Sequence, residues 1–418
     1  MHGGDEPGGR PGSARPTLTY LLIAIAAMLF QQALSTLATL VFPVAIPALG
    51  PALGIGAEAA GLYSGLLFFV SSMGQLSCGA LIVRNGALRM SQVSLALLGV
   101  GLILTALGQV WAIVVSAVLI GMGNSISTPA SSHLLARYAP PRYAPLVFSI
   151  KQTGVPVGGM AAGAIVPLLV VSYGWRSAFL AIGLVSIAFA LAIQPVRREF
   201  DRDRDPRQRF SLAAIGASVR LVLDDPGLRD YAAAMFCFVG LQAIFGAFFV
   251  SYLSDGLGYS LTAAGGVFAL AQSIAIGARI AWGWIGSRLL PPRIVLGGLG
   301  LGMAAASLGI AAIGPGMGYG AVLAIAVGYS ATAISWHGLL LSDVARRSPR
   351  GRIGPVTGSV VAFGGAGMMA YPLLYAGVLK VTGGYGWGFA IGAVPAALVG
   401  LRLLLRAEGP SGSARESP

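Results

Sequence analysis

The chain alternates between long apolar runs and short gaps of turn-forming or charged residues. Each run holds roughly 20 residues or more, the length with which an α-helix crosses the ~30 Å hydrocarbon core of a bilayer. The pattern predicts an all-α membrane protein with twelve transmembrane helices. The predicted spans are residues 18–47, 58–83, 90–110, 112–136, 144–172, 174–195, 230–254, 262–287, 293–313, 317–342, 354–380 and 385–405.

Basic residues indicate which gaps face the cytoplasm. Of the 27 Lys and Arg residues, 24 fall into seven alternate gaps, and the six intervening gaps hold only Arg176 and Lys380. Loops rich in Lys and Arg resist translocation and stay on the cytoplasmic side. The distribution predicts a multi-pass protein of a bacterial inner (plasma) membrane, with the N and C termini in the cytoplasm.

Composition excludes several other classes of protein. Charged residues make up 10% of the chain, whereas a soluble domain carries about 25%. The net charge of +13 arises in the predicted cytoplasmic loops, so no soluble face is left to bind nucleic acid. Cys78 and Cys237 lie in separate apolar runs and offer neither a disulfide framework nor metal-ligand spacing. With no phosphate-binding loop and no nucleophile–base pair, we expect no enzyme activity, no cofactor and no metal.

A long charged stretch divides the chain into two halves. The predicted organisation is a disordered cytoplasmic tail at 1–16, an N-terminal six-helix bundle at 17–196, a cytoplasmic linker at 197–229, a C-terminal six-helix bundle at 230–406 and a second disordered tail at 407–418. Within the linker, the apolar residues among 210–223 predict a short helix on the membrane surface.

The two halves repeat each other. Ala59-Ala60-Gly61 recurs as Ala263-Ala264-Gly265, and Arg84 recurs as Arg288, both 204 residues later. One constant offset across two spans and their loop indicates related three-dimensional units. Two parallel six-helix repeats with a site at their interface form a transporter architecture.

Two short motifs resemble those of a known family. The segment Gly79-Ala-Leu-Ile-Val-Arg84-Asn-Gly86-Ala-Leu-Arg89 resembles the motif of the major facilitator superfamily, and Gly283-Trp-Ile-Gly-Ser-Arg288 resembles its second-half copy. The resemblance implies alternating access between two bundles, with these glycines and arginines acting as gating residues at the cytoplasmic turns. The family's acidic position is Val83 in the first copy and Ser287 in the second, so we expect a weaker inner gate.

A second set of motifs is similar to one bacterial branch of that superfamily. Lys151-Gln-Thr-Gly-Val-Pro-Val-Gly-Gly159, Gly174-Trp-Arg176 and Trp336-His-Gly-Leu-Leu-Leu341 resemble cyanate-transporter-like proteins. This resemblance implies a fold and a mode of action without naming a substrate. The glycines at 154, 158, 159, 163, 364, 365 and 367 are expected to let helices pack closely where the halves slide.

Arg279 is the one basic residue inside an apolar run. It lies nine residues before Arg288, roughly 13 Å from the cytoplasmic edge. Because a guanidinium near mid-bilayer costs about 2.5–3.5 kcal/mol, it normally faces a wet cavity or a partner. Arg279-Ile-Ala-Trp-Gly283 resembles monocarboxylate and oxalate/formate transporters, in which such an arginine holds the substrate carboxylate; Gln272 shares its helix face. The alternative is a structural arginine that bonds backbone carbonyls.

Polar residues lie within the first, fourth, seventh and tenth spans. These are the spans that line the cavity in the family that this chain resembles. Asn124, Thr128 and Ser131 form one stripe on the fourth span. We predict that Gln32 and Asn124 orient the substrate and that Tyr329 and Trp336 shape the cavity. Hydrogen bonding between helices is the alternative for the Ser and Thr residues.

Titratable side chains inside the spans are few. None of the 14 acidic residues lies deep in a span, and Asp343 marks the inner end of the tenth. His133, His337 and Asp343 are therefore the candidates for proton coupling, with a structural histidine near a helix end as the alternative. Lys151 either attracts an anion or extends its ammonium to the membrane surface.

These observations predict a monomeric secondary active transporter in the lipid bilayer. Its small-molecule substrate is expected to be an organic anion of the carboxylate type, accompanied by a co-transported proton or exchanged for a counter-anion. Two alternatives are a multidrug or hydrophobic-compound efflux carrier of the same fold and a membrane protein that transports nothing. The direction of transport is left open by the sequence.

Overall fold

The computed structural model describes residues 18–140, 143–205, 207, 213–349 and 353–406. Within these ranges the regular elements are all helical. They are α1 (Leu18–Leu53), α2 (Glu58–Asn85), α3 (Ala87–Thr105), α4 (Val110–Tyr138), α5 (Ala144–Gln152), α6 (Gly154–Tyr173), α7 (Trp175–Ala192), α8 (Arg197–Phe200), α9 (Ala213–Asp224), α10 (Pro226–Ser251), η1 (Tyr252–Gly256), α11 (Leu261–Arg288), α12 (Pro292–Ala311), α13 (Tyr319–Ala333), α14 (His337–Arg347), α15 (Ile353–Thr382) and α16 (Tyr385–Leu405). The predicted disordered tails, 1–16 and 407–418, lie outside the described residues.

The predicted all-α membrane fold is confirmed. In the described part of the chain, eleven helical segments are long and apolar enough to cross a membrane, with α5–α6 and α13–α14 each counted as one segment. A twelfth is α2, whose two parts (Glu58–Gln75 and Cys78–Asn85) meet at a 60° bend. The side on which the termini lie stays a prediction.

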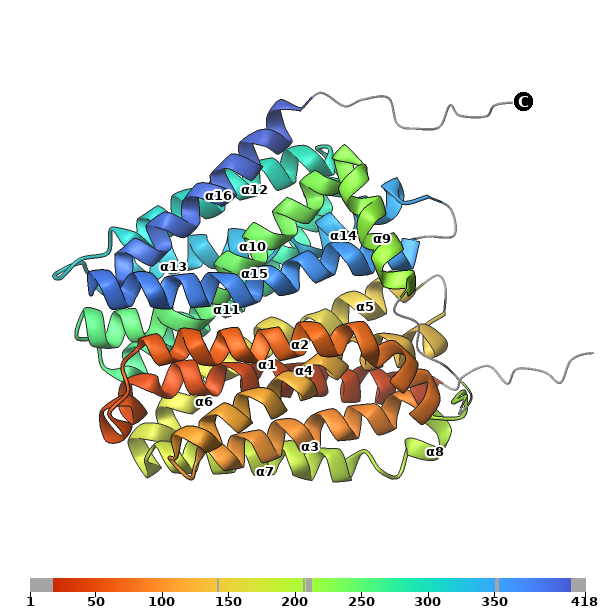
Figure 1. Cartoon of the computed structure of the whole chain (residues 1–418), viewed down its shortest axis with the longest axis horizontal. Helices are drawn as coiled ribbons and strands as arrows, with labels where there is room; N and C mark the ends of the chain where they lie inside the picture. Colours follow the sequence, from red (N-terminus) through yellow and green to blue (C-terminus); the bar gives the residue numbers. More distant parts are fainter. Residues whose placement is uncertain (1–17, 141–142, 206, 208–212, 350–352, 407–418) are drawn as a thin grey trace, which may run out of the picture.

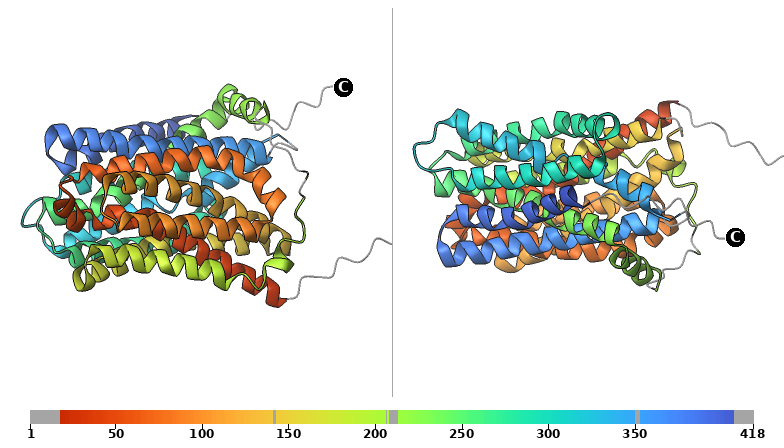
Figure 2. Two further views of the ribbon diagram at one scale, coloured as in Figure 1. Left: turned by 60° about the horizontal axis from the view of Figure 1, so that its bottom comes forward. Right: turned by 90° about the horizontal axis from the view of Figure 1, so that it is seen from above.

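The long helices form two groups. Figure 1 shows α1–α7 gathered in one bundle and α10–α16 in a second bundle beside it, with α8 and α9 at the same end of both. Figure 2 shows from two further sides that the long helices run in roughly one direction. Between the bundles, α2 packs on α15 and α6 packs on α11, while α1 contacts α10.

Glycines bring α6 against helices of both bundles. A Cβ atom on Gly163 would lie 2.6 Å from the carbonyl oxygen of Gly265 on α11. A Cβ atom on Gly154 would lie 2.7 Å from the carbonyl oxygen of Leu29 on α1. Because side chains at these points would separate the backbones, the predicted close packing by small residues is confirmed.

Two predicted spans contain a break that the apolar pattern does not show. The fifth span divides into α5 and α6 at Thr153, and the tenth divides into α13 and α14 over residues 334–336. Pro156 explains the first break, because it has no N–H to donate to the carbonyl four residues earlier. Over the second break, the Oγ of Ser335 donates to the carbonyl of Ala275 at 3.2 Å, which ties the irregular segment to α11.

The linker holds two short helices. Arg197–Phe200 forms α8. The second helix, α9, overlaps the region 210–223 for which a short helix was predicted and ends one residue beyond it; residues 210–212 lie outside the described residues. The first of these is held by Phe200, a fully buried residue whose ring meets that of Tyr138 edge-on at 5.0 Å. The second packs against α10 and α15. Both linker helices therefore have fixed positions against the bundles.

Candidate functional site

The guanidinium of Arg279 connects the two bundles. From α11 it donates through Nη1 to the carbonyl oxygen of Gln152 at 3.2 Å, and through Nη2 to that of Ile334 at 2.9 Å. The first acceptor ends α5 and the second follows α13, so each lies at a helix break.

Both carbonyls lack their usual helical donor. Within a continuous helix, the oxygen of Gln152 would accept from residue 156, which is a proline. Ile334 opens the irregular segment between α13 and α14, where the helical ladder is interrupted. Arg279 therefore supplies the missing donors, and the structural role proposed for it as an alternative is present in this conformation.

Those two hydrogen bonds do not exhaust the donors of Arg279. A guanidinium carries five N–H groups, of which two are used here. Its Nε is buried without a hydrogen-bond partner, and so are Gln152 Oε1 and His337 Nδ1. Within the described part of the chain, no carboxylate pairs with Arg279. The arrangement leaves both net positive charge and free donors for an anionic ligand.

A polar network crosses the N-terminal bundle where the sequence predicts substrate contacts. Thr128 donates to Oε1 of Gln32 at 3.1 Å. Ser35 donates to Oδ1 of Asn124 at 2.9 Å, and the Nδ2 of Asn124 donates to Ser71 at 2.9 Å. These bonds join α1, α4 and α2, and Ser71 is a member that the sequence prediction missed.

The predicted residues of the C-terminal bundle are packed more tightly. Tyr329 and Trp336 are fully buried; Tyr329 donates to the carbonyl of Leu241 at 2.7 Å, and Trp336 Nε1 donates to that of Ala333 at 2.8 Å. Gln272 is buried against Gly159 of α6, and its Oε1 has no partner. Among the described residues none of these three is hydrogen-bonded to Arg279, and their contact with substrate stays a prediction.

The position of Lys151 differs from one of its two interpretations in the sequence, the one in which its ammonium reaches the membrane surface. Only 1% of its surface is exposed, so its ammonium does not extend to the membrane surface, and that interpretation is wrong. No hydrogen bond or ion pair to this side chain is found among the described residues. The sequence could not reveal this burial, because it depends on neighbouring helices that cover the end of α5.

The three candidates for proton coupling lie in different surroundings. Asp343 is buried at the end of α14, where it accepts hydrogen bonds from Tyr231, Arg346 and Arg347, the last at 2.9 Å. His133 contacts Asp203 of the linker through Nε2 at 2.8 Å. The ring of His337 stacks on Trp336 with centroids 3.9 Å apart. Any role in proton transfer stays a prediction for all three.

At the first gating motif, an acid from the linker occupies the turn. Asp201 accepts from the backbone N–H of Leu88 at 2.7 Å and of Arg89 at 3.1 Å, which caps the start of α3. Burial raises the pKa of the Asp201 carboxyl, while these two N–H groups and Arg197 oppose the shift. Gly86 adopts φ +98°, and a Cβ there would collide with Asp201. Asp201, which is distant in sequence, thus lies beside the motif in which Val83 stands at the family's acidic position.

The remaining gating candidates form no ion pair among the described residues that would hold the inner gate closed. Arg84, Arg89 and Arg288 are exposed, and none has a side-chain ion pair among the described residues. A Cβ atom on Gly79 or Gly283 would meet open space. The predicted weak inner gate agrees with these surroundings but is not tested by them.

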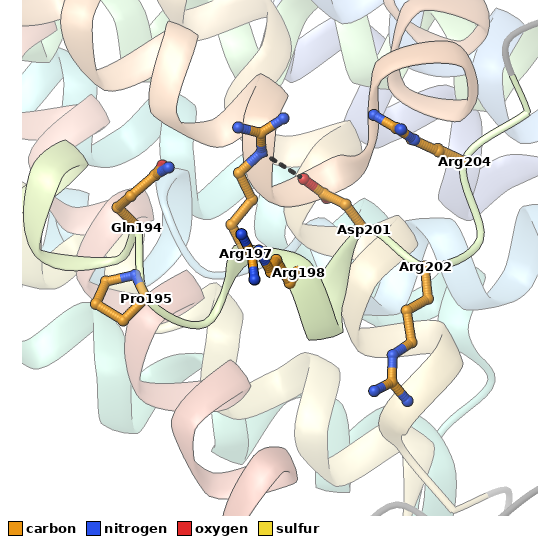
Figure 3. A pocket seen from close by; sticks show the side chains of 7 residues that line it. All are labelled: Gln194, Pro195, Arg197, Arg198, Asp201, Arg202 and Arg204. Carbon is orange, nitrogen blue, oxygen red and sulfur yellow. Dashed lines mark ion pairs between the residues drawn. The ribbon is translucent and has the colours of Figure 1, made fainter.

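A concave site lies outside the spans, at the end of α7. Figure 3 shows this cavity of about 700 Å³, which is lined by Gln194, Pro195, Arg197, Arg198, Asp201, Arg202 and Arg204. Arg197 reaches Asp201 at 3.5 Å, and Arg202 pairs with Glu199 at 2.7 Å. Its lining is strongly basic, with four arginines and one carboxylate. Neither here nor in the rest of the described ranges do three or more His, Cys, Asp or Glu side chains form a cluster that could hold a metal ion.

Comparisons with known proteins agree with this architecture. The family model described as Major Facilitator Superfamily matches residues 28–354. The "Uncharacterized transporter YybO" of Bacillus subtilis is 26% identical over 183 residues, which are 44% of this chain and 41% of that protein. The "Probable anion transporter 4, chloroplastic" of Oryza sativa subsp. japonica is 25% identical over 190 residues, which are 43% of this chain and 32% of that protein. Each match thus spans less than half of the relative's length.

Solved structures share the fold at low sequence identity. A POT family transporter in complex with 5-aminolevulinic acid superposes with a TM-score of 0.74 at 14% identity, covering 92% of this chain and 95% of that one. A bacterial homolog of the human lysosomal transporter Spinster, in an inward-facing and unoccupied conformation, superposes with a TM-score of 0.68 at 18% identity and the same coverage. At these identities the likeness establishes the fold alone.

Proposed function

The chain belongs to the major facilitator superfamily and is a multi-pass membrane transporter rather than an enzyme, and we propose that it carries a small organic anion of the carboxylate type by alternating access. We place it in a bacterial inner membrane, because its basic loops match the cytoplasmic side of such a membrane. Two six-helix bundles would expose a central site first to one side and then to the other.

The charge of Arg279 carries the proposal. It lies within the span Leu261–Arg288, and its two hydrogen-bond acceptors are neutral carbonyls. Among the described residues, two buried carboxylates within the helices, Asp230 and Asp343, are each paired with two arginines near the helix ends. A cation inside a membrane normally has a partner or marks a substrate pathway. A carboxylate substrate would provide that partner and satisfy the free Nε.

The packing between the bundles supports a carrier that is closed at one end. Away from α8 and α9, a Cβ on Gly61 would lie 2.6 Å from the ring of Phe248, and one on Gly163 would lie 2.6 Å from the carbonyl oxygen of Gly265. Towards the other end of α11, a Cβ atom on Gly277 or Gly283 would meet no neighbouring atom.

The names of related proteins give further support. One relative of partial length is named an anion transporter, and one protein of the same fold was solved with 5-aminolevulinic acid. Uptake of an anion against an inside-negative potential costs about 2.3 kcal/mol per charge per 100 mV. Proton symport or exchange for another anion would offset that cost. His133, His337 and Asp343 are the residues we would test for a role in proton symport.

Uptake by the purified protein in proteoliposomes tests the proposal. Labelled carboxylates should enter faster than into protein-free vesicles, and cationic dyes should not. Arg279→Gln should lower carboxylate uptake at least tenfold, and Arg279→Lys should restore part of it, because the charge is kept but the planar donor set is lost. Lys380→Gln removes an exposed cation from the end of α15 and should leave uptake unchanged. Transport of dyes without any carboxylate would favour the efflux alternative instead.

A further inference from the structure

We propose that Lys151 provides a second cationic contact in the central site and that the substrate is therefore an organic dianion, such as a dicarboxylate. This inference rests on the proposed anion transport. It goes further, because a carrier that uses Arg279 alone would accept monocarboxylates equally well.

The first argument is the burial of a lysine side chain without a hydrogen-bond or ion-pair partner among the described residues. Lys151 belongs to the span Leu146–Tyr173, 1% of its surface is exposed, and no described residue bonds to it. A charged lysine buried without a counter-ion loses several kcal/mol of solvation, and a bound anion would offset that loss. The sequence next to it contains no acidic residue from Tyr138 to Gln194.

The second argument is its position relative to Arg279. Lys151 precedes Gln152, whose carbonyl oxygen lies 3.2 Å from Nη1 of Arg279. Consecutive Cα atoms are 3.8 Å apart, so the two cations are carried by adjoining segments of backbone. Lys151 lies five residues from the start of the span Leu146–Tyr173 and Arg279 nine residues from the end of the span Leu261–Arg288, and both lie near the same boundary between the bundles.

The third argument is the helix face that Lys151 occupies. Thr153 keeps helical backbone angles (φ −65°, ψ −17°), so Lys151 and Gly154 share a face. A Cβ on Gly154 would lie 2.9 Å from Cβ of Gln32, which accepts from Thr128. Lys151 thus lies one helical turn before the point where Gly154 meets Gln32, a predicted substrate contact. Two cations on either side of one boundary match two acid groups on one substrate.

Paired substrates of equal chain length test this inference. Succinate and butyrate differ by one carboxylate, and counterflow in proteoliposomes measures both. Wild-type protein should prefer succinate at least tenfold. Lys151→Met should reduce that preference at least tenfold by slowing succinate while butyrate is spared, and Lys151→Arg should keep it. Lys380→Met is the control for loss of one positive charge at an exposed site.

Each failure has a distinct signature. If wild-type protein carries butyrate as well as succinate, or if Lys151→Met leaves the ratio unchanged, the second contact is wrong although anion transport stands. If neither acid is carried and no other carboxylate enters, the proposed function itself fails. The wild-type ratio needs no variant, so the inference can be tested even if Lys151→Met does not fold.

A different observation carries a second inference: we propose that the basic cavity at the end of α7 binds the phosphate of an anionic phospholipid headgroup. Arg198 and Arg204 line it, and their guanidinium groups have no partner among the described residues. The cavity begins directly after the span Trp175–Ala192, at the predicted cytoplasmic boundary where anionic headgroups lie. Buried Phe200 anchors α8, which carries Arg198. Next to Arg204, the N–H of Asp205 donates to the carbonyl of Val83 at 2.8 Å.

Thermal unfolding of the full chain in lipid nanodiscs tests this site. Replacing part of the phosphatidylcholine by phosphatidylglycerol should raise the midpoint by several degrees, and Arg198→Gln combined with Arg204→Gln should remove the shift. Arg220→Gln with Arg229→Gln removes the same charge from exposed positions of α9 and α10 and should retain it. Equal loss in both double variants would reduce the effect to net charge. An equal shift with inorganic phosphate in phosphatidylcholine would assign the site to a free anion, and either result overturns the lipid site.

Discussion

The guanidinium of Arg279 donates to the backbone carbonyl of Gln152 across the boundary between the two bundles. This contact exists because Pro156 has no N–H for that carbonyl. Pro156→Ala should restore the helical bond, make α5 and α6 continuous and release Arg279 from the N-terminal bundle. We expect transport to slow severalfold while thermal stability is unchanged or higher. Unaltered turnover would contradict a role for the break in the transport cycle.

The cap on α3 should contribute measurably to stability. Asp201→Ala removes the acceptor for the N–H groups of Leu88 and Arg89, which should cost about 0.5–2 kcal/mol of unfolding free energy. Asp201→Asn should retain part of this, since an amide oxygen also caps helices. Asp205→Ala, in the same linker, removes only a local contact to the N–H of Arg207 and serves as the control. Equal stability of both alanine variants would refute the cap.

The crossing of α6 and α11 should not tolerate a side chain. In Gly163→Ala the new Cβ would lie 2.6 Å from the carbonyl oxygen of Gly265 and 2.8 Å from the amide nitrogen of Ala269. We expect a loss of about 1–3 kcal/mol, measured as reduced thermal stability in detergent. Gly277→Ala on α11 has open space at the same atom and should behave like wild type.

Asn124 offers a way to separate substrate contact from structure. Its bonds to Ser35 and Ser71 resemble interhelical hydrogen bonds that contribute ~0.6 kcal/mol in membrane proteins. If Asn124 also orients the substrate, Asn124→Ala should raise KM at least tenfold, whereas Ser71→Ala, which removes one bond of the network, should change it little. Similar KM values in the two variants would leave Asn124 with a packing role.

The sequence predicts the spans well because the bilayer imposes one length and one polarity on every crossing segment. The break at Thr153 had a local signal in Pro156, but the break over residues 334–336 contains no proline and depends on bonds to α11, such as that from Ser335 to Ala275. Asp201 caps a helix that begins 114 residues earlier in the chain. Such long-range contacts leave no trace in periodicity or spacing.

The candidate site shows the same division between local and long-range information. Arg279 could be singled out because a lone cation in an apolar run is costly wherever it points. The burial of Lys151 could not be predicted, because a lysine near a helix end is exposed or buried depending on which neighbouring helices cover it. Gln32 and Thr128 lie in spans that were predicted to line the cavity, but their hydrogen bond, like the part of Ser71, depends on how α1, α2 and α4 pack.

The contact between Gly163 and Gly265 makes that point a natural pivot for the two bundles. Arg279 lies 14 residues further along α11, about 21 Å from the pivot at 1.5 Å per residue. A rocking motion of about 10° would displace the guanidinium by ~4 Å from Gln152, further than a hydrogen bond can stretch. The same lever that reorients the carrier would therefore change how many N–H groups Arg279 offers to its cargo, so binding strength and sidedness would be mechanically linked.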